Sequence, residues 1–171
     1  MKWVINFLSS SLGKKLMMAL TGVFLTLFLT IHLLGNLQLL KSDDGVAFNH
    51  YAHFMSTNSL IQIVSKVNFM FIIGHALLAL ILTKQNQAAR GPIGYVVTHT
   101  KSSLWASRNM GILGTILLVF IVIHLKDFYM KVHFAELITT TDTDGSSIPN
   151  VYVLVSAWFQ KDWYVALAPG W

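Results

Sequence analysis

Three histidines lie within long apolar stretches, where an ionisable side chain is costly and is usually kept for a function. They are His32, His75 and His124. A neutral imidazole binds a metal through one ring nitrogen while its other N–H donates to a nearby acceptor. Two such imidazoles on opposite faces of a porphyrin hold the iron of haem b. The alternative for each residue is a neutral histidine bonded to a neighbouring carbonyl or hydroxyl.

Two of these histidines lie at the same depth. His32 follows Lys15 by 17 residues, and His124 follows Arg108 by 16 residues. With a rise of about 1.5 Å per residue, both lie roughly 24–25 Å from one membrane face. This matched pair, with no buried carboxylate that would form a proton relay, favours bis-histidine ligation of haem b.

His75 lies at another level. It precedes Lys84 by nine residues, which places it roughly 13 Å from the same face. It is therefore about 11 Å deeper toward the cytoplasm than the other two and has no partner at its own level.

The composition predicts the elements that hold these residues. Hydrophobic residues make up 54% of the 171 residues and charged residues 11%, against roughly 25% charged in a soluble domain. Three stretches approach or exceed the 20 apolar residues that span a bilayer, at about 16–40, 60–83 and 110–128. We therefore expect an all-α membrane protein, a transmembrane helix bundle in a single domain. The absence of cysteine excludes disulfides and thiolate-bound metals.

The polar segments fit as connections between the spans. We expect a short helix around 48–55, a turn at Gly91-Pro92 and a solvated loop over 131–150. Residues 151–171 are apolar but interrupted by Lys161-Asp162, so we expect an interfacial segment there.

The charges orient the chain. With three spans, the N-terminus and the second connection share one side, and that side carries basic residues and no acid: Lys2, Lys14, Lys15, Lys84, Arg90, Lys101 and Arg108. The positive-inside rule places this side, and the N-terminus, in the cytoplasm.

Several short motifs occur in a specific order. They are Ser-Ser-Ser-Leu-Gly-Lys-Lys (9–15), Ala-Leu-Thr-Gly (19–22), His-Leu-Leu-Gly-Asn-Leu (32–37), Phe-Asn-His-Tyr-Ala-His-Phe-Met (48–55), Arg-Gly-Pro-Ile-Gly-Tyr (90–95), Ser-Arg-Asn-Met (107–110) and Phe-Ile-Val-Ile-His-Leu (120–125). Together they resemble the single-subunit, di-haem cytochrome b (b558-type) that anchors succinate dehydrogenase or fumarate reductase in the bacterial inner membrane. The likeness covers most of residues 5–167.

The resemblance implies five spans and two haems held by four histidines. His32, His75 and His124 match the ligands on the first, second and third helices. In that family the first and third bind the outer haem, and the second pairs with the fourth helix for the inner haem. The resemblance also implies a flavoprotein and an iron–sulfur subunit on the cytoplasmic face, and quinone as the electron partner. No nucleic acid is expected as a partner.

The chain departs from the family near its end. Residues 163–167 look like the start of the fourth helix, after which the sequence stops. We therefore expect a C-terminally truncated chain with three of five spans, in which the inner haem lacks a second histidine.

Further site residues are expected at the two membrane faces. Ser9, Ser10, Lys15 and Arg108 lie at the cytoplasmic rim, where propionates of an inner haem need donors. Near the outer face, His53 or His50 could serve a quinone through hydrogen bonds or proton exchange. The alternative for His50 and His53, as for His99 and His133, is an ordinary surface histidine.

Three other functions remain open at this point. The chain could be a haem-free anchor, reduced to a binding module by the missing helices. It could be a transporter or channel with a histidine proton path, although no inverted repeat or broken helix favours that. It could also be the cytochrome b of another respiratory complex, such as a hydrogenase or formate dehydrogenase.

Overall fold

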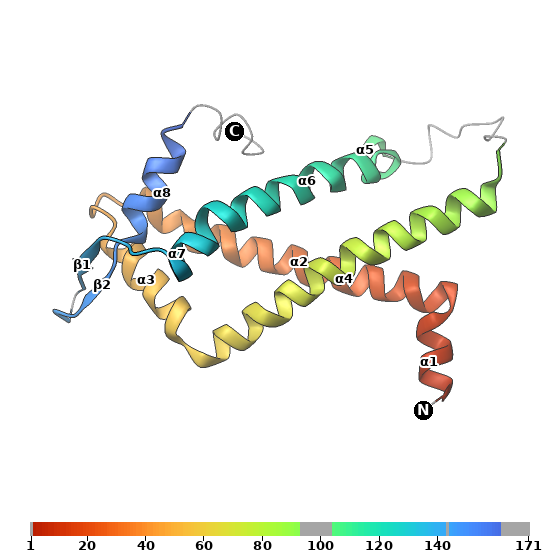
Figure 1. Cartoon of the computed structure of the whole chain (residues 1–171), viewed down its shortest axis with the longest axis horizontal. Helices are drawn as coiled ribbons and strands as arrows, with labels where there is room; N and C mark the ends of the chain where they lie inside the picture. Colours follow the sequence, from red (N-terminus) through yellow and green to blue (C-terminus); the bar gives the residue numbers. More distant parts are fainter. Residues whose placement is uncertain (1, 93–103, 143, 162–171) are drawn as a thin grey trace. The chain divides into compact units, whose positions relative to one another are not determined.

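The structure, a computed structural model, describes residues 2–92, 104–142 and 144–161, and most of them are helical (Figure 1). The chain divides into two compact units, which are treated separately below. The first contains residues 1–34 and 59–98, and the second contains residues 35–58 and 99–171. The expected start of a fourth helix at 163–167, and His99, lie outside the described residues.

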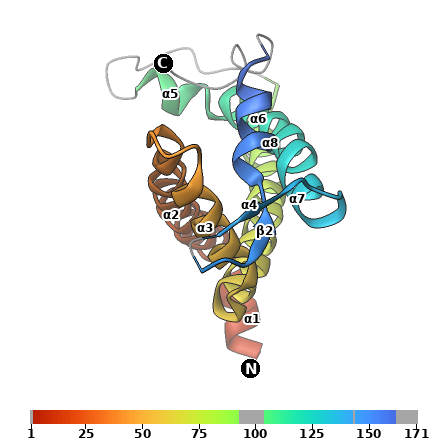
Figure 2. The same ribbon diagram turned by 90° about the vertical axis from the view of Figure 1, so that its left-hand side faces the viewer.

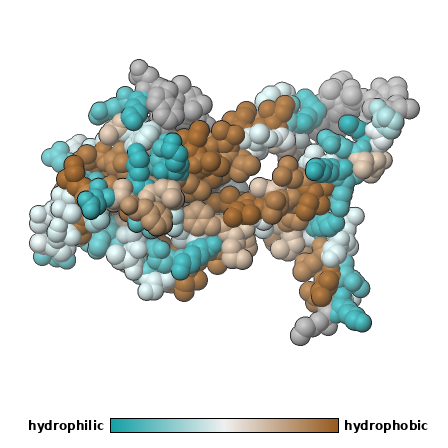
Figure 3. Space-filling view, in the orientation of Figure 1, coloured by the Kyte–Doolittle hydropathy of each residue, from teal (hydrophilic) through white to brown (hydrophobic). Residues whose placement is uncertain are grey.

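Three helical runs are long and apolar enough to cross a membrane: Ser11–Leu40, Ser59–Arg90 and Met110–Phe134. They confirm the three predicted spans and extend each by several residues. Large apolar side chains stay exposed along them (Figure 3). Such exposure is expected where lipid covers the helices, because acyl chains are as apolar as these side chains. The fold class is therefore an all-α membrane protein, as the composition predicts.

The first unit contains α1 (Lys2–Ser9), most of α2 (Ser11–Asn36) and α4 (Ser59–Arg90). Ser10 separates α1 from α2 and caps the second helix, since its Oγ accepts a hydrogen bond from Gly13 N at 3.0 Å. The same hydroxyl donates to Phe7 O at 2.6 Å. Helix α4 ends at Arg90, directly before Gly91. The φ of Gly91, +74°, is the left-handed conformation common just after a helix. The helix therefore ends at the predicted turn signal Gly91-Pro92.

The second unit contains the other spanning helix and the connections near it. Its helical elements are η1 (Leu37–Leu40), α3 (Val46–Thr57), α5 (Trp105–Arg108), α6 (Met110–His124), the π-helical turn η2 (Leu125–Tyr129), α7 (Met130–Phe134) and α8 (Val151–Phe159). Helix α3 confirms the short helix expected around 48–55. Helix α8 forms the described part of the expected interfacial segment.

A β-hairpin forms where only a solvated loop was expected. Strands β1 (Thr139–Thr141) and β2 (Ser147–Pro149) pair antiparallel, with Thr140 opposite Ile148. The β-branched threonines suit a strand, and Ile148 packs inward with only 1% of its surface exposed. Gly145 closes the turn with φ of +86° and donates from its N–H to Asp142 O at 3.0 Å. The loop prediction was wrong here because turn-forming residues suit a hairpin equally well.

Helix α3, the hairpin and α8 pack together; we call them the α3–α8 cluster (Figures 1 and 2). Asn49 of α3 is buried, with 2% of its surface exposed. Its Nδ2 donates to Asn150 Oδ1 at 3.1 Å, and its Oδ1 accepts from Tyr152 N at 2.8 Å. Asn150 Oδ1 also caps α8 by accepting from Val153 N at 3.2 Å. These polar contacts join segments about a hundred residues apart.

Gly45 offers a test of this packing. Its φ is +83°, and a Cβ there would overlap the side chain of Tyr152. Gly145 has a similar φ of +86°, but nothing lies within 4 Å of its added Cβ. We expect Gly145→Ala to destabilise its turn by about 1 kcal/mol through backbone strain alone. Gly45→Ala should cost more, because it also displaces α8 from α3.

The measurement is amide hydrogen exchange of α3 and α8 in detergent. Faster exchange in both helices is expected for Gly45→Ala and not for the control Gly145→Ala. Equal exchange of these helices in the two variants would contradict the described contact between Gly45 and Tyr152.

Candidate functional site

His75 lies half-buried on α4, against α2. Its Nδ1 is 2.9 Å from Oγ1 of Thr21, a buried residue of α2. A Cβ added at Gly22 would lie 3.4 Å from His75 Cε1, so the ring edge lies close to the α2 backbone. Thr21 precedes His32 by eleven residues, or about 16 Å along α2. The first unit therefore places His75 and His32 at different levels, as the sequence estimate has it.

His32 and His124 each stack on a phenylalanine one turn earlier in their own helix. The His32 ring stacks on Phe28, with centroids 5.5 Å apart and planes at 25°. The His124 ring stacks on Phe120 at 5.6 Å and 27°. In each case the phenylalanine precedes the histidine by four residues. His124 also contacts Phe128, with ring centroids 4.9 Å apart.

A haem and a metal ion bound by protein alone need different sets of donor side chains. Across residues 2–92, 104–142 and 144–161, no three His, Cys, Asp or Glu side chains gather to hold a metal ion. Haem does not need such a cluster, because the porphyrin supplies four nitrogens and the protein only the axial ligands.

The two histidines expected near the outer face have different surroundings. Nδ1 of His50 lies 3.0 Å from each carboxylate oxygen of Asp142, whose side chain is buried. His50 therefore joins α3 to the hairpin. His53 instead lines a cavity of about 230 Å³ in the second unit, together with Ala52, Ser56, Val132, His133, Pro149 and Val151.

His133 is the residue of this cavity that the sequence analysis had left with the surface histidines. Its Nδ1 lies 3.0 Å from Tyr129 O. Because a carbonyl oxygen only accepts, Nδ1 carries the hydrogen and Nε2 keeps a lone pair. The ring also stacks on Tyr129, with centroids 4.1 Å apart. The sequence analysis ended the third span at about residue 128, but the helical run continues to Phe134 and therefore includes His133.

The expectation that no buried carboxylate accompanies the membrane histidines was wrong, because the spanning run Met110–Phe134 contains one three residues after His124. Asp127 lies in the π-helical turn η2 with 1% of its surface exposed. Neither of its carboxylate oxygens has a hydrogen-bond partner among the described residues, although Lys126 Nζ lies 3.6 Å from Oδ1. Single π-helical turns inside α-helices often mark functional positions. In contrast, Asp144 lies in the exposed hairpin turn, where hydrogen bonds from Ser146 lower the pKa of its carboxyl.

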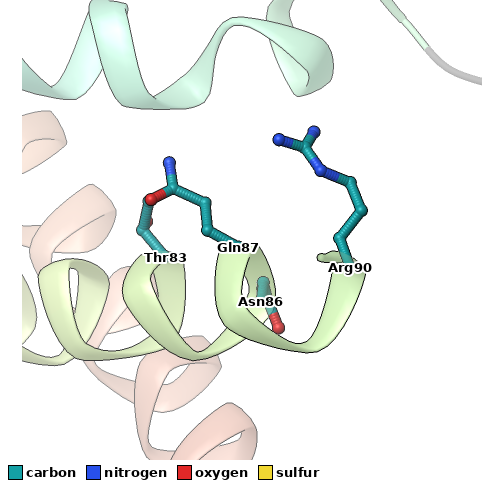
Figure 4. A pocket seen from close by; sticks show the side chains of 4 residues that line it. All are labelled: Thr83, Asn86, Gln87 and Arg90. Atoms are coloured by element: carbon teal, nitrogen blue, oxygen red, sulfur yellow. The ribbon is translucent and has the colours of Figure 1, made fainter. Parts of the chain in front are cut away.

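The expected rim residues lie in both units. Ser10 is already engaged with the backbone of Phe7 and Gly13, so a haem propionate would have to compete for its hydroxyl. Arg108 ends α5 directly before the third spanning run. A hollow of about 260 Å³ lies at the end of α4 and is lined by Thr83, Asn86, Gln87 and Arg90 (Figure 4). All four come from one helix, so we assign the hollow no ligand.

A comparison of the chain with protein-family models, curated proteins and solved structures found no match. The functional argument therefore rests on the residues of this chain.

Proposed function

We propose that this chain is the membrane-anchor cytochrome b of a succinate:quinone oxidoreductase, with His32 and His124 as the axial ligands of one haem b. The observation that carries the proposal is their matched distance from the same ends of two spans. His32 lies eight residues before Leu40, and His124 lies ten residues before Phe134. These separations correspond to about 12 and 15 Å, and their similarity supports a common level for the two imidazoles.

Haem b, when bound, accepts and releases one electron at a time, which is the chemistry needed between an iron–sulfur subunit and quinone. The chain's task is to hold it at a set depth. The phenylalanines stacked on His32 and His124 limit the rotation of each ring.

His75 is the proposed ligand of the inner haem, whose second ligand would come from a further helix. Arg108 is the proposed donor to a propionate of the inner haem; where that haem is bound, an unchanged inner-haem spectrum in Arg108→Gln would contradict this role.

The proposed orientation places the N-terminus in the cytoplasm of a bacterial cell. The basic residues of the N-terminal segment and of the second connection, with no acid among them, support it. That face would bind the flavoprotein and iron–sulfur subunits.

We place the quinone headgroup in the cavity lined by His53 and His133. Its volume of about 230 Å³ is just below the range of small-molecule sites, which begins at roughly 300 Å³. Nε2 of His133 can accept a hydrogen bond from the hydroxyl of the reduced quinol, and the His53 ring lines the same cavity, whereas the Ser56 hydroxyl donates to His53 O at 2.9 Å. His50 is bound to Asp142, so we assign it a structural role.

The haem proposal is tested by the haem content of the purified 171-residue chain. We expect one haem b per polypeptide in the reduced-minus-oxidised spectrum after expression with haem supplied. His32→Ala and His124→Ala should each lose it, because one imidazole leaves the iron without its second ligand. His75→Ala is the matched control and should keep it. A chain that folds without a Soret band would instead favour a haem-free anchor.

The quinone site is tested by labelling with an azido-quinone, which does not depend on bound haem. We expect the photolabel on peptides from α3 or α7, with competition by unlabelled quinone. His53→Ala should reduce labelling several-fold, because it removes one wall of the cavity. His50→Ala is the control in the same helix. Equal labelling of His53→Ala and the unaltered chain would exclude this cavity.

A further inference from the structure

The direction of the hydrogen bond between Thr21 and His75 follows from the other contacts of the Thr21 hydroxyl. Thr21 Oγ1 lies 2.8 Å from Met17 O and 3.1 Å from Met18 O. A hydroxyl has one hydrogen, and carbonyl oxygens only accept. The Thr21 proton is therefore directed at these carbonyls, and its oxygen presents a lone pair to His75 Nδ1 at 2.9 Å.

It follows that Nδ1 of His75 carries the hydrogen and Nε2 the lone pair. The reverse arrangement, with Thr21 donating to Nδ1, has one hydrogen bond fewer because the proton leaves the Met17 carbonyl. Thr21 has only 6% of its surface exposed, so water has little access to replace that bond. In a membrane interior a lost hydrogen bond is not restored by solvent.

The helix contact around this pair holds the ring in place. One turn away, Phe24 of α2 meets Phe71 of α4 edge to face, with centroids 4.7 Å apart and planes at 89°. Gly22 lies beside the ring edge, as described above. Helices α2 and α4 thus contact each other at the hydrogen bond and again one turn away, which limits the freedom of His75.

We infer that Thr21 is a positioning residue that selects the Nδ1–H tautomer of His75 and so keeps Nε2 available to the iron of a haem. This inference rests on the proposed function for the identity of the ligand. The tautomer itself is a property of the chain without haem. Ligating histidines are commonly held this way, and the hydrogen bond also raises the basicity of the ligating nitrogen.

The test is solid-state ¹⁵N NMR of the histidine-labelled, haem-free chain in lipid, with the His75 signals assigned from His75→Gln. We expect a protonated Nδ1 and an unprotonated Nε2 in the unaltered chain. Thr21→Ser keeps the hydroxyl and should keep this pattern. Thr21→Val keeps the shape but removes the acceptor, so the pattern should be lost. A protonated Nε2 in the unaltered chain, or no response to Thr21→Val, would overturn the inference.

A second readout separates this inference from the proposed function. In the 171-residue chain loaded with haem, and with imidazole added to supply the second ligand of the His75 site, Thr21→Val should raise the reduction potential of the haem held by His75 and leave the haem of His32 and His124 unchanged. If the tautomer pattern is found but no haem signal responds to His75→Gln, the ligand role of His75 is wrong and only the hydrogen bond stands. If the tautomer is the other one, the inference fails whichever haem is bound.

Discussion

The fold and the site both depend on one property of lipid, which offers no hydrogen bonds to the chain. Polar groups within a span therefore depend on partners in the protein, and among the described residues the buried exceptions are Asn68 Oδ1 and the Asp127 carboxylate. The threonines of the spans find such partners locally. Thr26, Thr30 and Thr115 each donate to the carbonyl four residues earlier, at 2.8–3.0 Å. An imidazole differs because its two ring nitrogens point in different directions, so one local carbonyl cannot serve both.

This difference explains why the histidines, and not the hydroxyls, carry the functional argument. His75 shows the principle within the described chain, since Thr21 serves Nδ1 and Nε2 is left with a lone pair for a second partner. A metal centre between helices supplies such a partner. The same requirement explains why two histidines on separate spans would lie at one depth, because a porphyrin iron takes its two axial ligands from opposite sides.

Outside the spans, polar groups are satisfied by side chains from distant parts of the sequence. Asn49 and Asn150 join α3 to α8, and His50 joins α3 to Asp142 of the hairpin. Lys131 of α7 lies over the Trp158 ring of α8, with Nζ 4.3 Å from its centroid, which adds cation–π attraction between the two helices. Lys161, just after α8, lies over the same ring at 3.7 Å. These contacts give the second unit a small core and leave a cavity beside His53 and His133.

The spans were predictable because length and apolarity are properties of consecutive residues. The depths of the histidines along their helices followed from the same counting. The hairpin was not predictable, since its threonines, aspartates and glycine suit a loop as well. The hydrogen bond between Thr21 and His75 joins residues 54 positions apart, and the cavity shared by His53 and His133 joins residues 80 positions apart. Both depend on the register between distant segments. No local pattern records that register, and the π-helical turn around Asp127 likewise depends on tertiary packing.

The central claim is that His32 and His124 supply the two axial ligands of one haem. Near-infrared magnetic circular dichroism of the oxidised, haem-loaded chain identifies axial ligands directly. The account predicts a bis-imidazole signature, converted to an imidazole–thioether signature by His32→Met and by His124→Met and unchanged by His75→Met. A bis-imidazole signature that survives in His124→Met, or that changes in His75→Met, would contradict it.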